Sequence, residues 1–114
     1  MPLSNIQDTI FSSQAFTAPG NGTTIQVADT DAFSTKNYTL FAVVTNINTN
    51  VVVCLDGSID GTNWSKIIAN QTITGNGTTH YTVANCPVRY IRSVFVSESG
   101  GTAATVTLQV AASA

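Results

Sequence analysis

The stretch Val52–Trp64, VVCLDGSIDGTNW, decides how the rest of the chain is interpreted. An apolar, β-branched run typical of a strand enters a loop with two Asp-Gly steps and leaves it on the only tryptophan. Asp-Gly pairs tolerate the positive φ angles that tight hairpin turns require. The stretch therefore predicts two strands joined by a rigid loop, with Trp64 packed more in the core than on the surface. The residues expected to shape the loop are Asp56, Gly57, Asp60, Gly61 and Trp64.

Strand-like segments separated by turn residues continue on both sides of this stretch. They recur at the spacing of about 8–12 residues that is typical of antiparallel sandwiches and barrels, and no helical period extends over them. The segments expected to form strands are 10–18, 23–28, 37–47, 51–55, 64–69, 79–83, 89–97 and 102–111, and 70–74 either continues one of them or forms another. The sequence therefore predicts an all-β fold, an antiparallel β-sandwich of about eight strands.

The connections between these segments carry turn residues. Residues 48–50 read as a short hairpin, and 75–77 as a tight turn. The polar segment 29–36 has room for one helical turn. Residues 1–8 are interpreted as a short N-terminal arm, which leaves 9–114 as a single β-sandwich domain, a length that suits one core.

The surface is expected to be poor in charge. Only 9% of the residues are charged, well below the usual quarter, while Thr (18 residues) and Asn (10 residues) are abundant. Such a surface must be covered by hydroxyls, amides or other protein. This composition is common in secreted modules, adhesins and virion shell proteins, and rare in cytosolic enzymes.

The charge balance and the apolar runs exclude several partners. Four basic residues in a chain of net charge −2 are too few to follow a phosphate backbone, so no nucleic-acid partner is expected. No apolar run reaches the roughly 18 residues of a membrane span, so no membrane partner is expected. The first eight residues lack the basic and apolar regions of a secretory signal, which predicts synthesis in the cytoplasm.

The two cysteines, Cys54 and Cys86, are too far apart in sequence to form a close metal-ligand pair. Their separation would permit a disulfide between strands. Because no secretory signal precedes them, two free, buried thiols are favoured.

Apolar residues on both faces of two strands indicate packing against a neighbour. In 105–110 apolar and polar residues alternate cleanly, as in a sandwich with one wet face. In 37–47 and 88–96 apolar side chains fall on both faces, and a domain of this size has few elements to cover the second one. We therefore expect a homo-oligomer, and coverage by loops or by the N-terminal arm is the alternative. The candidate interface residues are Tyr38, Leu40, Phe41, Val43, Tyr90, Arg92, Val94 and Val96.

No arrangement of residues predicts catalysis. The single histidine, His80, has no nucleophile or carboxylate marked beside it and is interpreted as a surface strand residue. Ser58 lacks the Gly-x-Ser-x-Gly elbow of a catalytic serine. We therefore expect neither an enzyme nor a bound cofactor.

The acidic loop matches a calcium loop only in part. Asp56, Ser58 and Asp60 fall on three liganding positions of an EF-hand, but Ile67 stands where the bidentate glutamate is needed. An EF-hand is excluded and no metal is assigned, while an irregular Ca²⁺ site on Asp56 and Asp60 stays open. Otherwise Asp60-Gly61 forms a type I′ hairpin corner, with Asp56 accepting hydrogen bonds from backbone N–H groups of the loop.

Aromatic residues on the strands leave sugar binding open. The aromatics that could form a platform are Trp64, Tyr38, Tyr81 and Tyr90. Scattered aromatics on strands are more often core or interface residues. An exposed patch around Trp64 is the feature that would favour a sugar site.

Three motifs resemble a recurrent layout in small proteins of tailed bacteriophages. They are the loop Gly57–Trp64 (GSIDGTNW), the strand start Arg89–Arg92 (RYIR), and the Gly-rich turn with a Thr/Val-rich strand at 100–106 (GGTAATV). The resemblance covers roughly residues 38–110. It implies a compact, jelly-roll-like β-sandwich in a virion component such as a head decoration (cement) protein. Discoidin-like carbohydrate-binding domains share the pattern Ser58–Trp64 but are usually longer.

The resemblance and the composition together favour a non-enzymatic virion structural protein that binds the outer surface of a phage capsid and stabilises it. The expected partners are the major capsid protein or another virion protein, and copies of the chain itself, with a trimer favoured because multivalent attachment raises avidity. The expected location is the capsid surface, after synthesis in the host cytoplasm. The alternatives are a carbohydrate-binding or adhesive module and a tail-associated phage protein.

Overall fold

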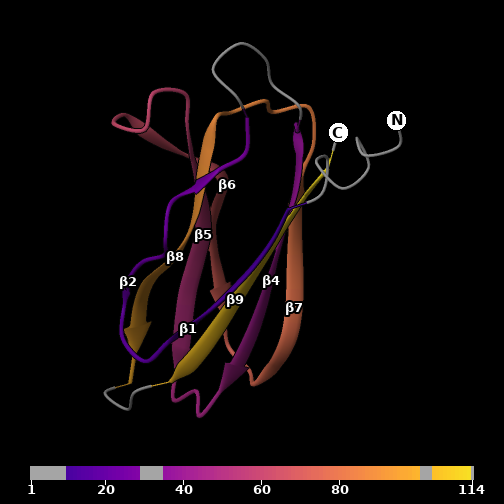
Figure 1. Cartoon of the computed structure of the whole chain (residues 1–114). Helices are drawn as coiled ribbons and strands as arrows, with labels where there is room; N and C mark the ends of the chain where they lie inside the picture. The colour runs from indigo at the N-terminus through magenta and orange to yellow at the C-terminus, as the bar shows by residue number, and fades with distance from the viewer. Residues whose placement is uncertain (1–9, 29–34, 101–103, 114) are drawn as a thin grey trace.

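The computed structural model describes residues 10–28, 35–100 and 104–113, and this part of the chain forms nine β-strands (Figure 1). The strands are β1 (Ile10–Phe16), β2 (Gly20–Asn21), β3 (Ile25–Gln26), β4 (Asn37–Thr45), β5 (Asn50–Ser58), β6 (Trp64–Ile73), β7 (Gly77–Val83), β8 (Tyr90–Ser99) and β9 (Thr105–Ser113). Within these described residues no helix is long and apolar enough to cross a membrane. The expected N-terminal arm lies outside them, as does most of the segment expected to hold a helical turn.

The strands form two antiparallel sheets, which we call sheet A and sheet B. Sheet A has the order β1-β9-β4-β7, and sheet B has the order β2-β8-β5-β6. β3 also pairs with β8, next to the segment that β2 occupies, so β2 and β3 act as one interrupted strand. Counted in this way, eight strands have the order of a jelly roll, and the chain changes sheet after every strand except between β5 and β6. The prediction of an antiparallel, jelly-roll-like β-sandwich of about eight strands is confirmed.

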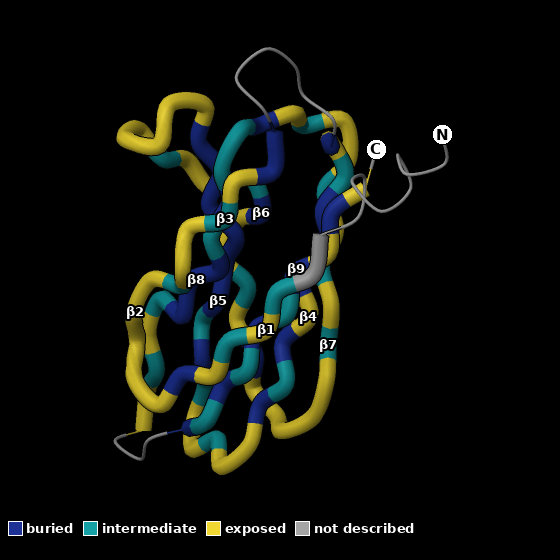
Figure 2. The backbone as a smooth tube through the Cα atoms, in the orientation of Figure 1, coloured by how far each residue is buried: buried dark blue, intermediate teal, exposed yellow. Residues whose placement is uncertain are grey.

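The core lies between the two sheets and is built by alternation along their central strands (Figure 2). On β4 the side chains of Leu40, Ala42 and Val44 are fully buried, while Phe41 between them is 39% exposed. Successive residues of a strand point to opposite faces, so the same strands also present an outer face. The other central strands contribute Val51, Val53, Leu55, Ile91, Phe95, Val106, Leu108 and Val110 to the core.

Tyr38 closes one end of this core. Its side chain is 1% exposed, and its hydroxyl lies 3.1 Å from Thr35 Oγ1 and 3.2 Å from the backbone oxygen of Thr35. Burial raises the pKa of the Tyr38 phenol, which keeps the group neutral. The prediction that Tyr38 and Leu40 form an interface is therefore corrected. Alternation along β4 turns both of them inward, so they are core residues.

β5 extends three residues beyond the predicted strand and takes in the first Asp-Gly step. Gly57 is buried and faces the core, where a Cβ atom would lie 2.8 Å from Ile67 Cγ2 and 3.1 Å from Val88 Cγ1. Gly57 is therefore a strand residue that lets two side chains approach the backbone, and its assignment to the loop is wrong. Residues 70–74 continue the preceding strand as far as Ile73, so β6 is one long strand.

The chain crosses between the sheets after β4. β4 pairs with β7 and β9, whereas β5 pairs with β6 and β8. The predicted hairpin at 48–50 is therefore wrong, because the two strands that it joins lie in different sheets. Asn46, with φ of 57°, begins this crossing. β5 and β6 do form the hairpin that the opening stretch predicted.

Candidate functional site

The loop between β5 and β6 is held in shape by the carboxylate of Asp60. Its Oδ1 accepts a hydrogen bond from Ser58 Oγ at 3.1 Å. The backbone N–H groups of Thr62 and Asn63 donate to the same oxygen at 2.8 Å each, and Asn63 Nδ2 donates to Oδ2 at 2.6 Å. Gly61 has a φ of 80° and donates its N–H to Ser58 Oγ at 2.9 Å. Both oxygens of Asp60 and the hydroxyl of Ser58 thus serve the loop itself.

This geometry corrects two expectations for the loop. Gly61 alone has a positive φ within residues 59–63, whereas a type I′ corner needs two such residues. The carboxylate that accepts the loop N–H groups belongs to Asp60, while Asp56 lies on β5. Among the residues that the structure describes, no group of three or more His, Cys, Asp or Glu side chains could hold a metal ion.

We expect Asp60→Asn to lower the melting temperature at neutral pH. Hydrogen bonds from Asn63 and Thr62 hold the pKa of Asp60 well below its usual range, the backbone N–H of Asn63 contributing most. A carboxyl whose pKa is lower in the folded chain stabilises the fold above its unfolded pKa of about 4. That contribution to stability is lost as the pH falls through the pKa that Asp60 has in the folded chain. Thermal melts from pH 7 to pH 2 should therefore show the two proteins converging in acid, and an equal difference at every pH would contradict this assignment.

The outer face of sheet B carries an ion pair stacked on the tryptophan. Arg92 on β8 and Asp56 on β5 are register partners, and Arg92 Nε donates to Asp56 Oδ2 at 3.2 Å. The Arg92 guanidinium carbon lies 4.1 Å from the centre of the Trp64 ring. Trp64 is half-buried on this face, so the expectation that it packs mainly in the core is wrong. One face of its ring is covered by Arg92, which leaves less of it for a sugar to stack on.

Cys54 lies on the same face of β5 as Asp56 and is buried. Burial, and then the charge of Asp56, raises the pKa of the Cys54 thiol to about 11, so the thiol is protonated and unreactive at neutral pH. Cys86 is half-buried, and both cysteines are free thiols. A hollow of about 410 Å³ lies over Cys54, with Lys66 and the β2 edge among its lining residues.

The outer face of sheet A is four strands wide and uncharged. Three rows of residues cross it from β1 over β9 and β4 to β7. The rows are Ala111-Thr39-Thr82, Ser13-Gln109-Phe41-His80 and Ala15-Thr107-Val43-Thr78, the first of them described from β9 onward. None of these eleven positions holds Asp, Glu, Lys or Arg. The face is therefore made of hydroxyls, methyl groups, one amide and the rings of the middle row.

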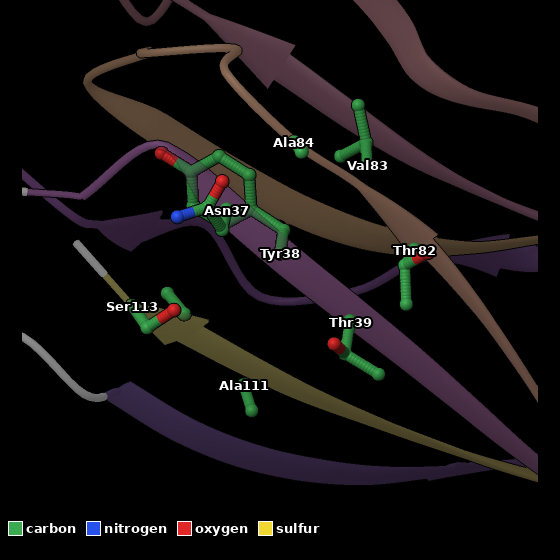
Figure 3. Close-up of a pocket in the computed structure, with 9 residues that line it drawn as sticks. Asn37, Tyr38, Thr39, Thr82, Val83, Ala84, Ala111 and Ser113 are labelled. Atoms are coloured by element: carbon green, nitrogen blue, oxygen red, sulfur yellow. The ribbon is translucent and has the colours of Figure 1, made fainter.

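A ridge and a hollow lie side by side on this face. The rings of Phe41 and His80 stack with their centres 5.2 Å apart, and we call this pair the Phe41–His80 ridge. Next to it, small side chains of three neighbouring strands, Thr39, Thr82 and Ala111, line a hollow of about 290 Å³ (Figure 3). We call it the Thr39 hollow. His80 is exposed at the surface of a strand, where the sequence placed it.

The candidate interface residues do not form one patch. Phe41 and Val43 lie on the outer face of sheet A, whereas the four candidates on β8 lie on the outer face of sheet B, where Val94 is buried. The members on sheet B are Tyr90, Arg92, Val94 and Val96. Sequence reasoning missed the Thr39 hollow, which is built from small residues on strands far apart in the chain. The signal that the sequence offered for this hollow was an alternating run without charged residues in each of the three strands that line it.

Comparisons with known proteins show the fold. No family model matches this chain, and no curated protein matches it. YomS, a protein derived from the SPBc2 prophage, superposes with a TM-score of 0.55 at 11% identity, over 92% of this chain and 95% of that one. The coat protein of Tobacco streak virus gives a TM-score of 0.45 at 5% identity, over 93% and 86% of the two chains. The N-terminal cellulose-binding domain of a Cellulomonas fimi glucanase gives a TM-score of 0.46 at 11% identity, over 92% of this chain and 76% of that one. The likeness to YomS shows a shared β-sandwich fold.

Proposed function

We propose that this chain is a non-enzymatic structural protein of a tailed-phage particle, which binds the outer surface of the capsid and stabilises it. The observation that carries the proposal is the outer face of sheet A, where three rows across four strands hold no charged side chain. Depletion of charge marks the centres of protein–protein interfaces. A face of this extent is an assembly surface, which is what a structural subunit needs.

Two further observations support a virion role. The strand order is that of a jelly roll, an architecture that recurs in viral capsid and lectin domains. Three sequence motifs, in residues 57–64, 89–92 and 100–106, resemble small phage proteins. Contacts made by neutral groups are not screened by salt, so assembly through the outer face of sheet A would persist as the ionic strength outside the cell changes.

Sugar binding fits the geometry less well. Its best residue, Trp64, is half-buried, and the guanidinium of Arg92 covers one face of its ring at 4.1 Å. Sugars stack on open aromatic faces, and one face of the Trp64 ring is already covered by the cation of Arg92. Retention on a glycan array would nevertheless favour the adhesive alternative over capsid binding.

Capsid binding is tested by fractionating particles. Tagged chain is mixed with phage from the source strain, and intact particles, isolated heads and isolated tails are separated on density gradients. We expect the chain to sediment with particles and heads, and to raise the temperature at which heads release their DNA. Tails serve as the matched control. Sedimentation with tails alone, or with none of the fractions, would refute the proposal.

A further inference from the structure

The outer face of sheet A fits a second copy of itself. The Phe41–His80 ridge occupies the middle row of this face, and the Thr39 hollow spans the row beside it and the next row outward, which holds Asn37 and Ser113. Neighbouring rows are two residues, or about 7 Å, apart along a strand. A two-fold axis between the rows would therefore bring the ridge of each copy over the hollow of the other. Such a contact is isologous, since the same patch serves both partners.

The charges of the chain favour this face over others. The chain has a net charge of −2, so two copies repel each other weakly. The three rows of sheet A add nothing to that repulsion, because they hold no charged residue. The outer face of sheet B holds Asp56, Lys66 and Arg92. Self-pairing through sheet B would remove the exposed ammonium of Lys66 from water, at a cost that sheet A avoids.

The size of the face is close to what a specific interface needs. β7, with 7 residues, sets the length that all four strands share. At about 3.4 Å per residue and about 4.8 Å between strands, the face covers roughly 24 by 19 Å, or about 450 Å². Two copies contribute about 900 Å² of projected face, and protruding side chains add to it, which approaches the ~1,000 Å² expected of a specific interface.

We infer that two copies of this chain pair through the outer faces of their A sheets, each Phe41–His80 ridge seated in the Thr39 hollow of the other copy. The pair is a four-sheet stack whose outermost surfaces are the charged outer faces of the two B sheets. This two-fold pair takes the place of the trimer that avidity suggested. The inference rests on the proposed function for its purpose: the uncharged A face joins subunits of the particle to one another, and an outer B face of the pair is left to meet the capsid.

The oligomeric state of the purified chain tests the inference. Sedimentation velocity and native mass spectrometry at micromolar concentration should show a dimer. Thr39→Arg places a charge in the hollow and should weaken dimerisation on the order of 100-fold, since an unpaired charge would be buried. Phe41→Ala removes half of the ridge and should weaken it on the order of tenfold. Thr72→Arg is the matched control, because Thr72 is exposed on β6 of sheet B, and it should leave the dimer unchanged.

Other outcomes would overturn the inference. A monomer at tens of micromolar, a trimer, or a dimer that Thr39→Arg leaves intact would each do so. Circular dichroism and thermal melts check that the variants are folded, and Phe41→Ala, at an exposed position, carries the test if Thr39→Arg does not fold. The particle assay separates the two proposals. A wild-type dimer that ignores phage heads refutes capsid binding alone, whereas a wild-type monomer that binds heads refutes the pairing alone.

Discussion

Leu40→Ala is expected to lower the free energy of unfolding by about 2–5 kcal/mol, while Phe41→Ala costs less than about 1 kcal/mol. The two residues are neighbours on β4, but Leu40 is fully buried between the sheets and Phe41 is 39% exposed on the outer face. Truncating Leu40 leaves a cavity in a packed core, whereas truncating Phe41 removes side chain that already meets water.

Urea unfolding followed by circular dichroism measures both changes. The proteins should be compared at one low concentration, so that self-association does not add to the apparent stability. The pair is its own control, because both changes shorten a large apolar side chain in the same strand. Equal losses of stability for Leu40→Ala and Phe41→Ala would contradict the assignment of Leu40 to the core face of β4 and of Phe41 to its outer face.

Gly57→Ala is expected to destabilise the fold by about 1–3 kcal/mol, and Gly57→Val by more. A Cβ atom at this position would lie 2.8 Å from Ile67 Cγ2 and 3.1 Å from Val88 Cγ1, so the hairpin of β5 and β6 or the packing of Val88 must shift. The change overfills the core at the point where the strand approaches the loop. Chemical denaturation of the purified variants gives the difference.

Gly20→Ala is the matched control for this change. Gly20 lies on the short strand β2 and has no positive φ, and a Cβ atom there would meet nothing within 4 Å beyond its chain neighbours. Alanine at this position reduces the freedom of the unfolded chain and should leave stability unchanged or slightly higher. If Gly20→Ala destabilised as much as Gly57→Ala, backbone freedom rather than crowding would explain both results.

Local sequence signals predicted most of the strands and one hairpin. The opening stretch predicted β5, its loop and β6, because turn residues and a β-branched run act over a few neighbouring positions. The same kind of signal was wrong at 48–50, where the chain crosses between sheets. Whether two successive strands pair is decided by which other strands flank them, and no short window of sequence contains that information.

The faces of the strands were predictable in part. Period-two alternation placed Val106, Leu108 and Val110 in the core, where the structure has them. For β4, apolar residues on both faces made the two faces look alike, so Leu40 and Phe41 were both assigned to an interface although one of them is a core residue. The Thr39 hollow was out of reach, because it needs the register of β4, β7 and β9.

The jelly-roll order also sets when this protein can fold. β1 pairs along its whole length with β9, and β2 and β3 pair with β8. The first strands can therefore pair only once the last strands are present. Such long-range pairing places folding at the slow end for a small domain, in the range of about milliseconds to seconds. On the ribosome, sheet A cannot close until β9 has emerged from the exit tunnel. The pairing that we propose through sheet A therefore requires that β9 has been translated.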